Sequence, residues 1–134
     1  MAKIIEIEGV GPIYAAKFQE IGIRTVEALL KAGAEPKDRQ DLADKTGISR
    51  ELILEWVNHA DLYRIKGVAE EYSDLLEEAG VDTVVELATR NPENLYKKII
   101  ETNQEKKLVR RPPSQKMVEE WIAQAKDLPR AVFY

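Results

Sequence analysis

Apolar residues recur at every third or fourth position over most of the chain, which is the spacing of one face of an α-helix. In 12–22, Ala15, Phe18 and Ile21 follow this spacing, and Pro12 suits the first position of a helix. The run Ile4-Ile5-Glu6-Ile7 is too short to carry a sheet, so we expect an all-α fold. The predicted helices cover 12–22, 25–32, 38–45, 49–62, 70–78, 83–90, 91–100 and 114–128.

The segment 7–30 is repeated at 65–88, at a constant shift of 58 positions. A second match relates 49–62 to 114–128 and pairs Trp56 with Trp121, the two tryptophans of the chain. A large ring at a repeated position usually belongs to the core, so each tryptophan should fill its own half. We expect two copies, 1–64 and 65–134, in one compact unit, with an insertion in the second copy. The residues identical at this shift are Ile7, Gly9, Val10, Tyr14, Glu20, Gly22, Thr25, Val26 and Leu29.

Composition excludes several kinds of site. The 134 residues carry a net charge of −4, no cysteine and one histidine, so we expect no disulfide, no metal site and no cofactor. The chain has no apolar run long enough for a membrane span and no signal-peptide pattern, so we expect a cytoplasmic protein without a membrane partner. The acidic balance argues against strong nonspecific binding of DNA.

The sequence offers little catalytic chemistry. We expect the sole histidine, His59, to be a surface or half-buried residue of a helix rather than a general base. Neighbouring acidic residues such as Glu70 and Glu71 point apart on a helix, so they form no carboxylate pair. No phosphate-binding loop, nucleophile elbow or zinc-protease motif is present, and we therefore expect no enzymatic activity.

One stretch departs from the acidic balance. Between Lys97 and Lys116 there are seven basic and two acidic side chains, a local net charge of +5. We expect 103–114 to be irregular, because Pro112 and Pro113 force an extended backbone. The charge run forms either a solvated face or a contact surface for an anionic partner. The basic residues that we assign to such a contact are Lys106, Lys107, Arg110 and Arg111.

The first repeat contains a glycine-bearing turn, Gly9-Val10-Gly11, directly before a predicted helix. Glycine permits a positive φ and a close backbone approach, and the turn directs free N–H groups toward solvent at the positive end of the helix. These features form an anion site that needs no base-specific contact. The candidate phosphate contacts are Gly9, Val10, Gly11, Ile13 and Lys17.

The second turn, Gly67-Val68-Ala69, is less suited to an anion. Ala69 replaces the second glycine, and Glu70 and Glu71 stand at the start of the following helix. Acidic residues there stabilise the helix and repel phosphate, so we interpret Gly67, Val68 and Ala69 as a structural hairpin.

These residues resemble a known motif. Ile7-x-Gly9-Val10-Gly11-x-x-Tyr14-Ala15 resembles the helix-hairpin-helix motif of DNA-repair and DNA-processing proteins, and the segment 65–79 resembles it less closely. The resemblance implies paired copies about a pseudo-twofold axis in a compact five-helix domain. The whole chain, including 108–114 and the Trp121 helix, also resembles domain of unknown function 4332, a family of uncharacterised microbial proteins classed with helix-hairpin-helix folds. This second resemblance implies a fold and no particular activity.

Two functions of different kinds fit the sequence. The first is a noncatalytic module that binds the backbone of DNA or RNA weakly, without sequence preference, through the first turn and the basic stretch. The second is a protein-interaction or scaffold module with structural hairpins, whose apolar tail 131–134 either docks on the body or meets a protein partner. The segment 41–57 also reads as a helix-turn-helix, but its second helix leaves little polar face for reading a groove.

Overall fold

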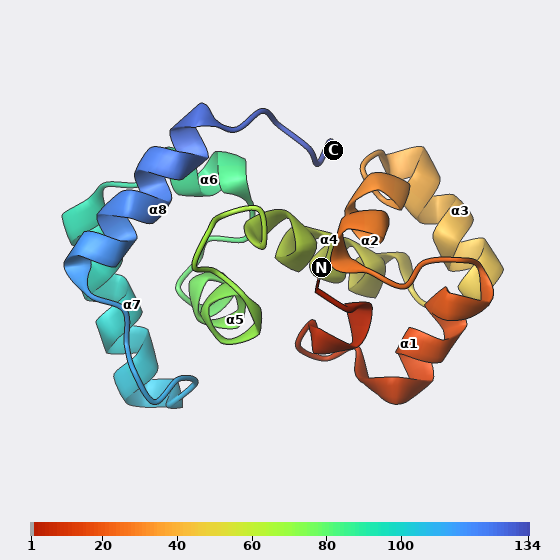
Figure 1. The fold of residues 1–134 in the computed structure, drawn as a ribbon, viewed down its shortest axis with the longest axis horizontal. Helices are drawn as coiled ribbons and strands as arrows, with labels where there is room; N and C mark the ends of the chain where they lie inside the picture. Colours follow the sequence, from red (N-terminus) through yellow and green to blue (C-terminus); the bar gives the residue numbers. More distant parts are fainter. Residues whose placement is uncertain (1) are drawn as a thin grey trace. The chain divides into compact units, whose positions relative to one another are not determined.

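The computed structural model describes residues 2–134, and its regular secondary structure is helical (Figure 1). A short 3₁₀ segment, η1 (Ile4–Glu6), precedes eight α-helices in the described residues, which confirms the all-α prediction for 2–134. The only pairing of extended backbone in this part of the chain is an isolated antiparallel bridge between Lys3 and Thr25. None of the described helices combines the length and the apolar character that crossing a bilayer requires. The α-helices are α1 (Gly11–Glu20), α2 (Val26–Ala32), α3 (Pro36–Thr46), α4 (Arg50–Leu62), α5 (Glu70–Glu78), α6 (Val84–Ala88), α7 (Pro92–Lys106) and α8 (Gln115–Asp127).

Capping residues set the starts of several helices. The side-chain oxygens of Thr25, Thr83 and Ser114 accept the backbone N–H three residues further on, at 3.1, 3.2 and 3.2 Å. The side chain of Asn91 does the same for α7 at 3.0 Å. These bonds satisfy N–H groups that have no partner in the first turn of a helix.

Helix α7 is longer than predicted. The irregular stretch was expected from Asn103, but the helix continues to Lys106. Lys107 then adopts φ 52° and donates its N–H to the carbonyl of Asn103 at 2.8 Å, which closes the last turn. The prediction was wrong for 103–106 because the prolines that break the helical pattern lie six residues further along the chain.

The described chain divides into two compact units. The first unit ends at Asp61 and also includes Ala131–Tyr134, whereas the second unit is Leu62–Arg130. The sequence had suggested one compact unit with halves 1–64 and 65–134. The structure differs most at 131–134, whose contacts lie in the first unit although the sequence assigned them to the second half.

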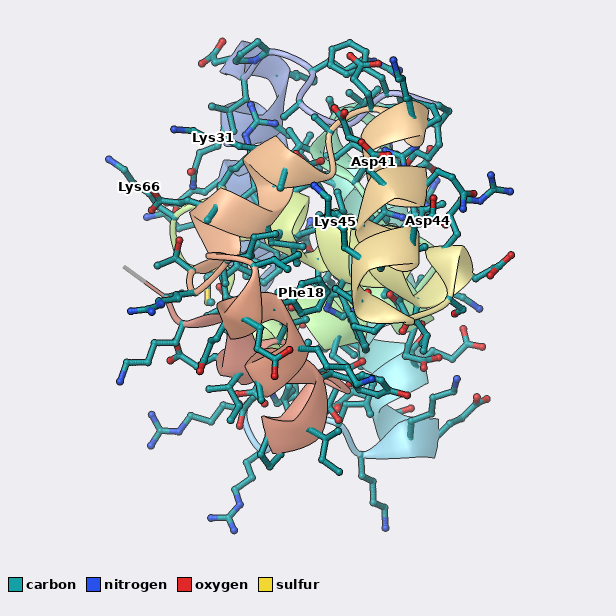
Figure 2. The ribbon with its side chains drawn as sticks, turned by 90° about the vertical axis from the view of Figure 1, so that its right-hand side faces the viewer. Phe18, Lys31, Asp41, Asp44, Lys45 and Lys66 are labelled. Carbon is teal, nitrogen blue, oxygen red and sulfur yellow. The ribbon has the colours of Figure 1, made fainter. Side chains whose placement is uncertain are left out.

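Trp56 is the centre of the first unit. It is 1% exposed, and its ring centroid lies 5.1 Å from that of Tyr14 and 5.9 Å from that of Phe18, both on α1. Helix α2 also reaches α4, because Gly33 at its end lies directly against Val57. Helix α3 turns a charged side to solvent, where Asp41 and Asp44 are exposed (Figure 2).

The segment 131–134 docks within the first unit around Arg39, which is only 3% exposed. The guanidinium donates to the carbonyls of Gly33, Ala34 and Phe133 at 2.8, 3.0 and 2.7 Å. The N–H of Phe133 donates to the carbonyl of Ala34 at 2.8 Å, and the Tyr134 ring centroid lies 5.8 Å from the guanidinium carbon. Burial lowers the pKa of Arg39 below its ordinary value.

Trp121 has the corresponding position in the second unit. It is 2% exposed, and its ring centroid lies 5.3 Å from that of Tyr72 on α5. Helix α8 packs against α6 and α7, and α7 packs against α5. The loop residue Val109 joins the same apolar core at 7% exposure. The prediction that both tryptophans are core residues is confirmed.

Local contacts match at the same shift of 58 that relates the two sequences. The N–H of Val10 donates to the carbonyl of Ile7 and the N–H of Val68 to that of Ile65, both at 3.1 Å. A Cβ added at Gly9 would lie 3.4 Å from the Trp56 indole nitrogen, and one added at Gly67 would lie 3.3 Å from that of Trp121. In each unit, therefore, the turn passes close over the tryptophan of that unit.

Candidate functional site

The first turn, Gly9-Val10-Gly11, has the backbone that its glycines predicted. Gly9 adopts φ 89° and Gly11 φ 63°, both in the left-handed region that favours glycine. Val10 points inward and is 1% exposed, whereas Gly9 is exposed. The turn therefore inserts an apolar side chain into the core and leaves its glycine backbone open to solvent.

This turn presents hydrogen-bond donors at the start of α1. The N–H groups of Gly9, Gly11 and Ile13 donate to no other group of the chain between residues 2 and 134. The first turn of α1 contains no acidic residue, and its Pro12 has no N–H. A partial positive charge of about half a unit is expected at such a helix end. An anion approaching here meets free donors and no nearby carboxylate in the helix itself.

The two other predicted contact residues of this site, Ile13 and Lys17, have different surroundings. Ile13 is 74% exposed, so its side chain projects into solvent beside the turn. The ammonium group of Lys17 donates to the carbonyl of Thr46 at the end of α3, at 3.4 Å. Lys17 therefore compensates the negative end of α3, and the structure does not bring its charge to the glycine turn.

The second turn differs where the sequences differ. Gly67 adopts φ 94°, but Ala69 adopts φ −133°, an extended conformation open to any residue. Glu70 and Glu71 occupy the first turn of α5. The side-chain amide of Gln124 accepts the N–H of Lys66 at 2.8 Å and donates to its carbonyl at 3.2 Å. The backbone leading into this turn is thus engaged by α8, and acidic residues follow it.

The four basic residues of the second unit that were predicted as contacts fall into two groups. Lys106 forms an ion pair with Glu78, and that hydrogen bond raises the pKa of Lys106 above its ordinary value. Lys107, Arg110 and Arg111 are exposed and form no ion pair with any residue of the described chain. These three side chains, which follow α7, are the cations available to an anionic partner.

The structure thus places the predicted contacts in two separate groups. Gly9, Val10, Gly11, Ile13 and Lys17 belong to the first unit, and Lys106, Lys107, Arg110 and Arg111 belong to the second. The sequence did not single out Gln124, which bonds the backbone of Lys66, or Arg39, which holds the segment 131–134. A glutamine or an arginine in a helix with many polar residues carries no local sign of a distant partner.

Two further expectations concern α4. His59 was expected at the surface or half-buried, but it is 2% exposed, because every residue of α4 from Trp56 to Leu62 is buried and not only those on one face. Ile53 and Trp56 are also buried on this helix, at 0% and 1% exposure. The helix that would have to read a groove in a helix-turn-helix protein is therefore used for packing.

Comparison with known proteins gives one match. A family model described as domain of unknown function 4332 matches residues 8–128. No curated protein matches the chain, and no solved structure matches it. Because the family model covers nearly the whole length, from the first turn to the end of α8, the chain belongs to the domain of unknown function 4332 family.

Proposed function

We propose that 7–30 and 65–88 are two copies of a helix-hairpin-helix unit. Three matched features support this proposal: the turn hydrogen bonds of Val10 and Val68, the threonine caps of α2 and α6, and the approach of each turn glycine to a tryptophan. A shared origin of the copies explains why sequence and local contacts repeat at one shift.

We further propose that the protein is a noncatalytic module that binds nucleic-acid backbone weakly and without sequence preference. The observation that carries this proposal is the exposed first turn, whose N–H groups lie unbonded at the start of a helix without acidic residues in its first turn. Such a helix start favours phosphate oxygens, which are the same in every nucleotide. The second turn, with Glu70 and Glu71 at its helix, has a structural role in this proposal.

Charge sets the expected strength of this binding. The chain has a net charge of −4, and the exposed carboxylate of Glu8, directly before the first turn, repels phosphate. Attraction comes from the first turn and from Lys107, Arg110 and Arg111. Each phosphate neutralised by a cation adds about −0.9 to the slope of log K against log salt for duplex DNA. Three such cations predict a slope of about −3 and affinity that is appreciable only at low salt.

Fluorescence anisotropy with labelled single-stranded DNA, duplex DNA and RNA at low and physiological salt tests this proposal. The informative variant is Gly11→Glu, which adds a carboxylate to the turn, with Gly22→Glu as its matched control. Both glycines adopt a positive φ, 63° and 86°, and a Cβ at either position meets nothing within 4 Å. The two substitutions therefore strain the backbone similarly, but Gly22 lies at the opposite end of α1.

We expect Gly11→Glu to abolish the binding that Gly22→Glu retains. In the loop that follows α7, Arg110→Glu should reduce the magnitude of the salt slope by about one, whereas Lys31→Glu on α2 should leave the slope unchanged. Lys31 is an exposed lysine of the first unit (Figure 2), so its reversal changes the net charge equally. The proposal would be overturned if Gly11→Glu and Gly22→Glu lost the same amount of binding, or if Arg110→Glu and Lys31→Glu reduced the salt slope equally. It would also be overturned if the wild-type protein bound no nucleic acid at low salt.

A second candidate function is protein interaction through 131–134. Two observations favour it. Phe133 and Tyr134 are 39% and 67% exposed, and the backbone of Phe133 is held in place by hydrogen bonds to Ala34 and Arg39. Exposed aromatic rings on an ordered backbone are common anchors of protein interfaces. This function would be supported over the first if the wild-type protein bound no nucleic acid but self-associated in sedimentation experiments, and if Phe133→Ser abolished that association.

A further inference from the structure

The loop after α7 has a fixed backbone although it contains no regular secondary structure. The side chain of Asn103 bonds both polar groups of Val109: its amide donates to the carbonyl at 3.1 Å, and its oxygen accepts the N–H at 3.0 Å. Val109 is also 7% exposed and belongs to the core of the second unit. This residue is therefore anchored through both its backbone and its side chain.

A second anchor comes from Tyr72 in the first turn of α5. Its hydroxyl donates to the carbonyl of Arg111 at 2.9 Å. The ring of Tyr72 is itself held against Trp121, at 5.3 Å between centroids and 53° between planes. The helix that follows the second turn is thus connected to the basic loop by a rigid aromatic side chain.

Between and beside these anchors, the charged side chains point to solvent. Lys107, Arg110 and Arg111 are exposed, whereas Val109 and Pro113 are buried. The buried positions fix the path of the chain, and the exposed positions present three cations from an ordered backbone. Ordering a loop in advance reduces the entropy that binding would otherwise cost.

We propose that the loop Lys107–Pro113 is a preformed phosphate-contacting arm and that Tyr72 and Asn103 are its positioning residues. The second hairpin then contributes to nucleic-acid binding through Tyr72, which holds the arm, and not through its own turn. This inference rests on the proposed function, since the ligand of the arm is the same phosphodiester backbone. Neither positioning residue touches the ligand in this arrangement.

Tyr72→Phe tests the inference because it removes only the hydroxyl and keeps the ring on Trp121. Tyr14→Phe is the matched control in the first unit. Tyr14 lies against Trp56 at 5.1 Å and 54°, and its hydroxyl bonds to no group within residues 2–134. Binding of a labelled duplex DNA at low salt is measured for both variants, together with ¹⁵N heteronuclear NOE values for Arg110 and Arg111 and the melting temperature.

We expect Tyr72→Phe to bind about fivefold more weakly, the equivalent of ~1 kcal/mol, which is the usual net value of one hydrogen bond. The NOE values of Arg110 and Arg111 should fall, and the melting temperature should show that both variants remain folded at the temperature of the binding assay. Tyr14→Phe should change neither binding nor NOE values. Asn103→Ala should reproduce the loss of affinity and of loop order, because it releases both bonds to Val109.

The outcomes separate this inference from the function on which it rests. If Tyr72→Phe binds like wild type while Arg110→Glu does not, the positioning role is overturned and the proposed function stands. Unchanged NOE values in Tyr72→Phe would also overturn the positioning role, without reference to DNA. If the wild-type protein binds no duplex at low salt, both proposals fail together.

Discussion

Replacing Gly33 by alanine should destabilise the first unit, although the backbone at this position accepts any residue. Gly33 follows α2 with φ −113°, so alanine encounters no conformational strain there. A Cβ at this position would, however, lie 2.5 Å from Cγ2 of Val57. Ordinary contacts between carbon atoms are about 3.5–4.0 Å, so the two groups would overlap by about 1 Å.

The overlap cannot be relieved by a simple side-chain rotation. Val57 is fully buried on α4, and a β-branched side chain in a helix is largely restricted to one rotamer. The end of α2 and α4 must therefore move apart, and overpacking of this kind usually costs about 1–3 kcal/mol. Alanine also reduces the freedom of the unfolded chain, which offsets about 0.4–1 kcal/mol. The expected net loss of unfolding free energy is ~1–2 kcal/mol.

Urea unfolding followed by tryptophan fluorescence measures this loss in the first unit. A Trp121→Phe background leaves Trp56 as the sole tryptophan and hence as the reporter of its own unit. With an m-value of about 1–2 kcal/mol/M, Gly33→Ala should lower the midpoint by about 1 M. Val57→Ala alone should also destabilise, because it leaves a cavity.

The double variant Gly33→Ala/Val57→Ala supplies the decisive comparison. The new methyl group then occupies space that the valine has vacated, so the double variant should be more stable than the sum of the single effects by at least 1 kcal/mol. Additive effects would show that the two positions do not compete for space. A Gly33→Ala protein as stable as wild type would refute the overlap itself.

Three further predictions concern stability. Thr25→Ala should lower the free energy of unfolding reported by Trp56, and Thr83→Ala that reported by Trp121, each by about 1 kcal/mol, because each removes an N-cap bond. A change reported by the other tryptophan would contradict this assignment. Glu78→Gln should destabilise the protein at neutral pH, because Glu78 raises the pKa of Lys106 above its ordinary value of 10.5. This stabilisation is present below pH 10.5 and is lost as the pH rises through the pKa of Lys106 in the folded protein. The urea midpoints of the variant and the wild type should therefore converge at a pH above that pKa. Tyr134→Phe should lower the free energy of unfolding of the first unit by about 0.5–1.5 kcal/mol, because it removes the hydroxyl that donates to the side-chain oxygen of Asn58 at 3.0 Å. An unchanged free energy would mean that this bond is not formed in solution.

Helix starts were predictable because capping is local. Thr25, Thr83 and Ser114 bond backbone groups three residues away, so the residue type and its place before an apolar run are sufficient information. The end of α7 could not be predicted from local residue types. It is set by Lys107 in the left-handed region and by the bonds of Asn103 to Val109, and no residue there is a glycine or proline.

The candidate site shows the same division between local and distant causes. The positive φ of Gly9 and Gly11 and the burial of Val10 follow from the residues of the turn itself. The partner of Lys17 is the carbonyl of Thr46, and α3 brings that carbonyl close only in the folded unit. Likewise, nothing around Arg39 in the sequence indicates that its third acceptor is contributed by Phe133.

The return of 131–134 to the first unit has a consequence for the order in which the protein matures. Domains usually fold in the order in which they leave the ribosome. Here the third acceptor of the buried Arg39 guanidinium does not exist until 62–130 has been made, roughly 3–14 s later at about 5–20 residues per second. The later-made second unit, Leu62–Arg130, therefore has its full set of residues before the first unit does. During that interval the guanidinium of Arg39 has only two of its three backbone acceptors, the carbonyls of Gly33 and Ala34, and the first unit reaches its final set of contacts only after the second unit is complete.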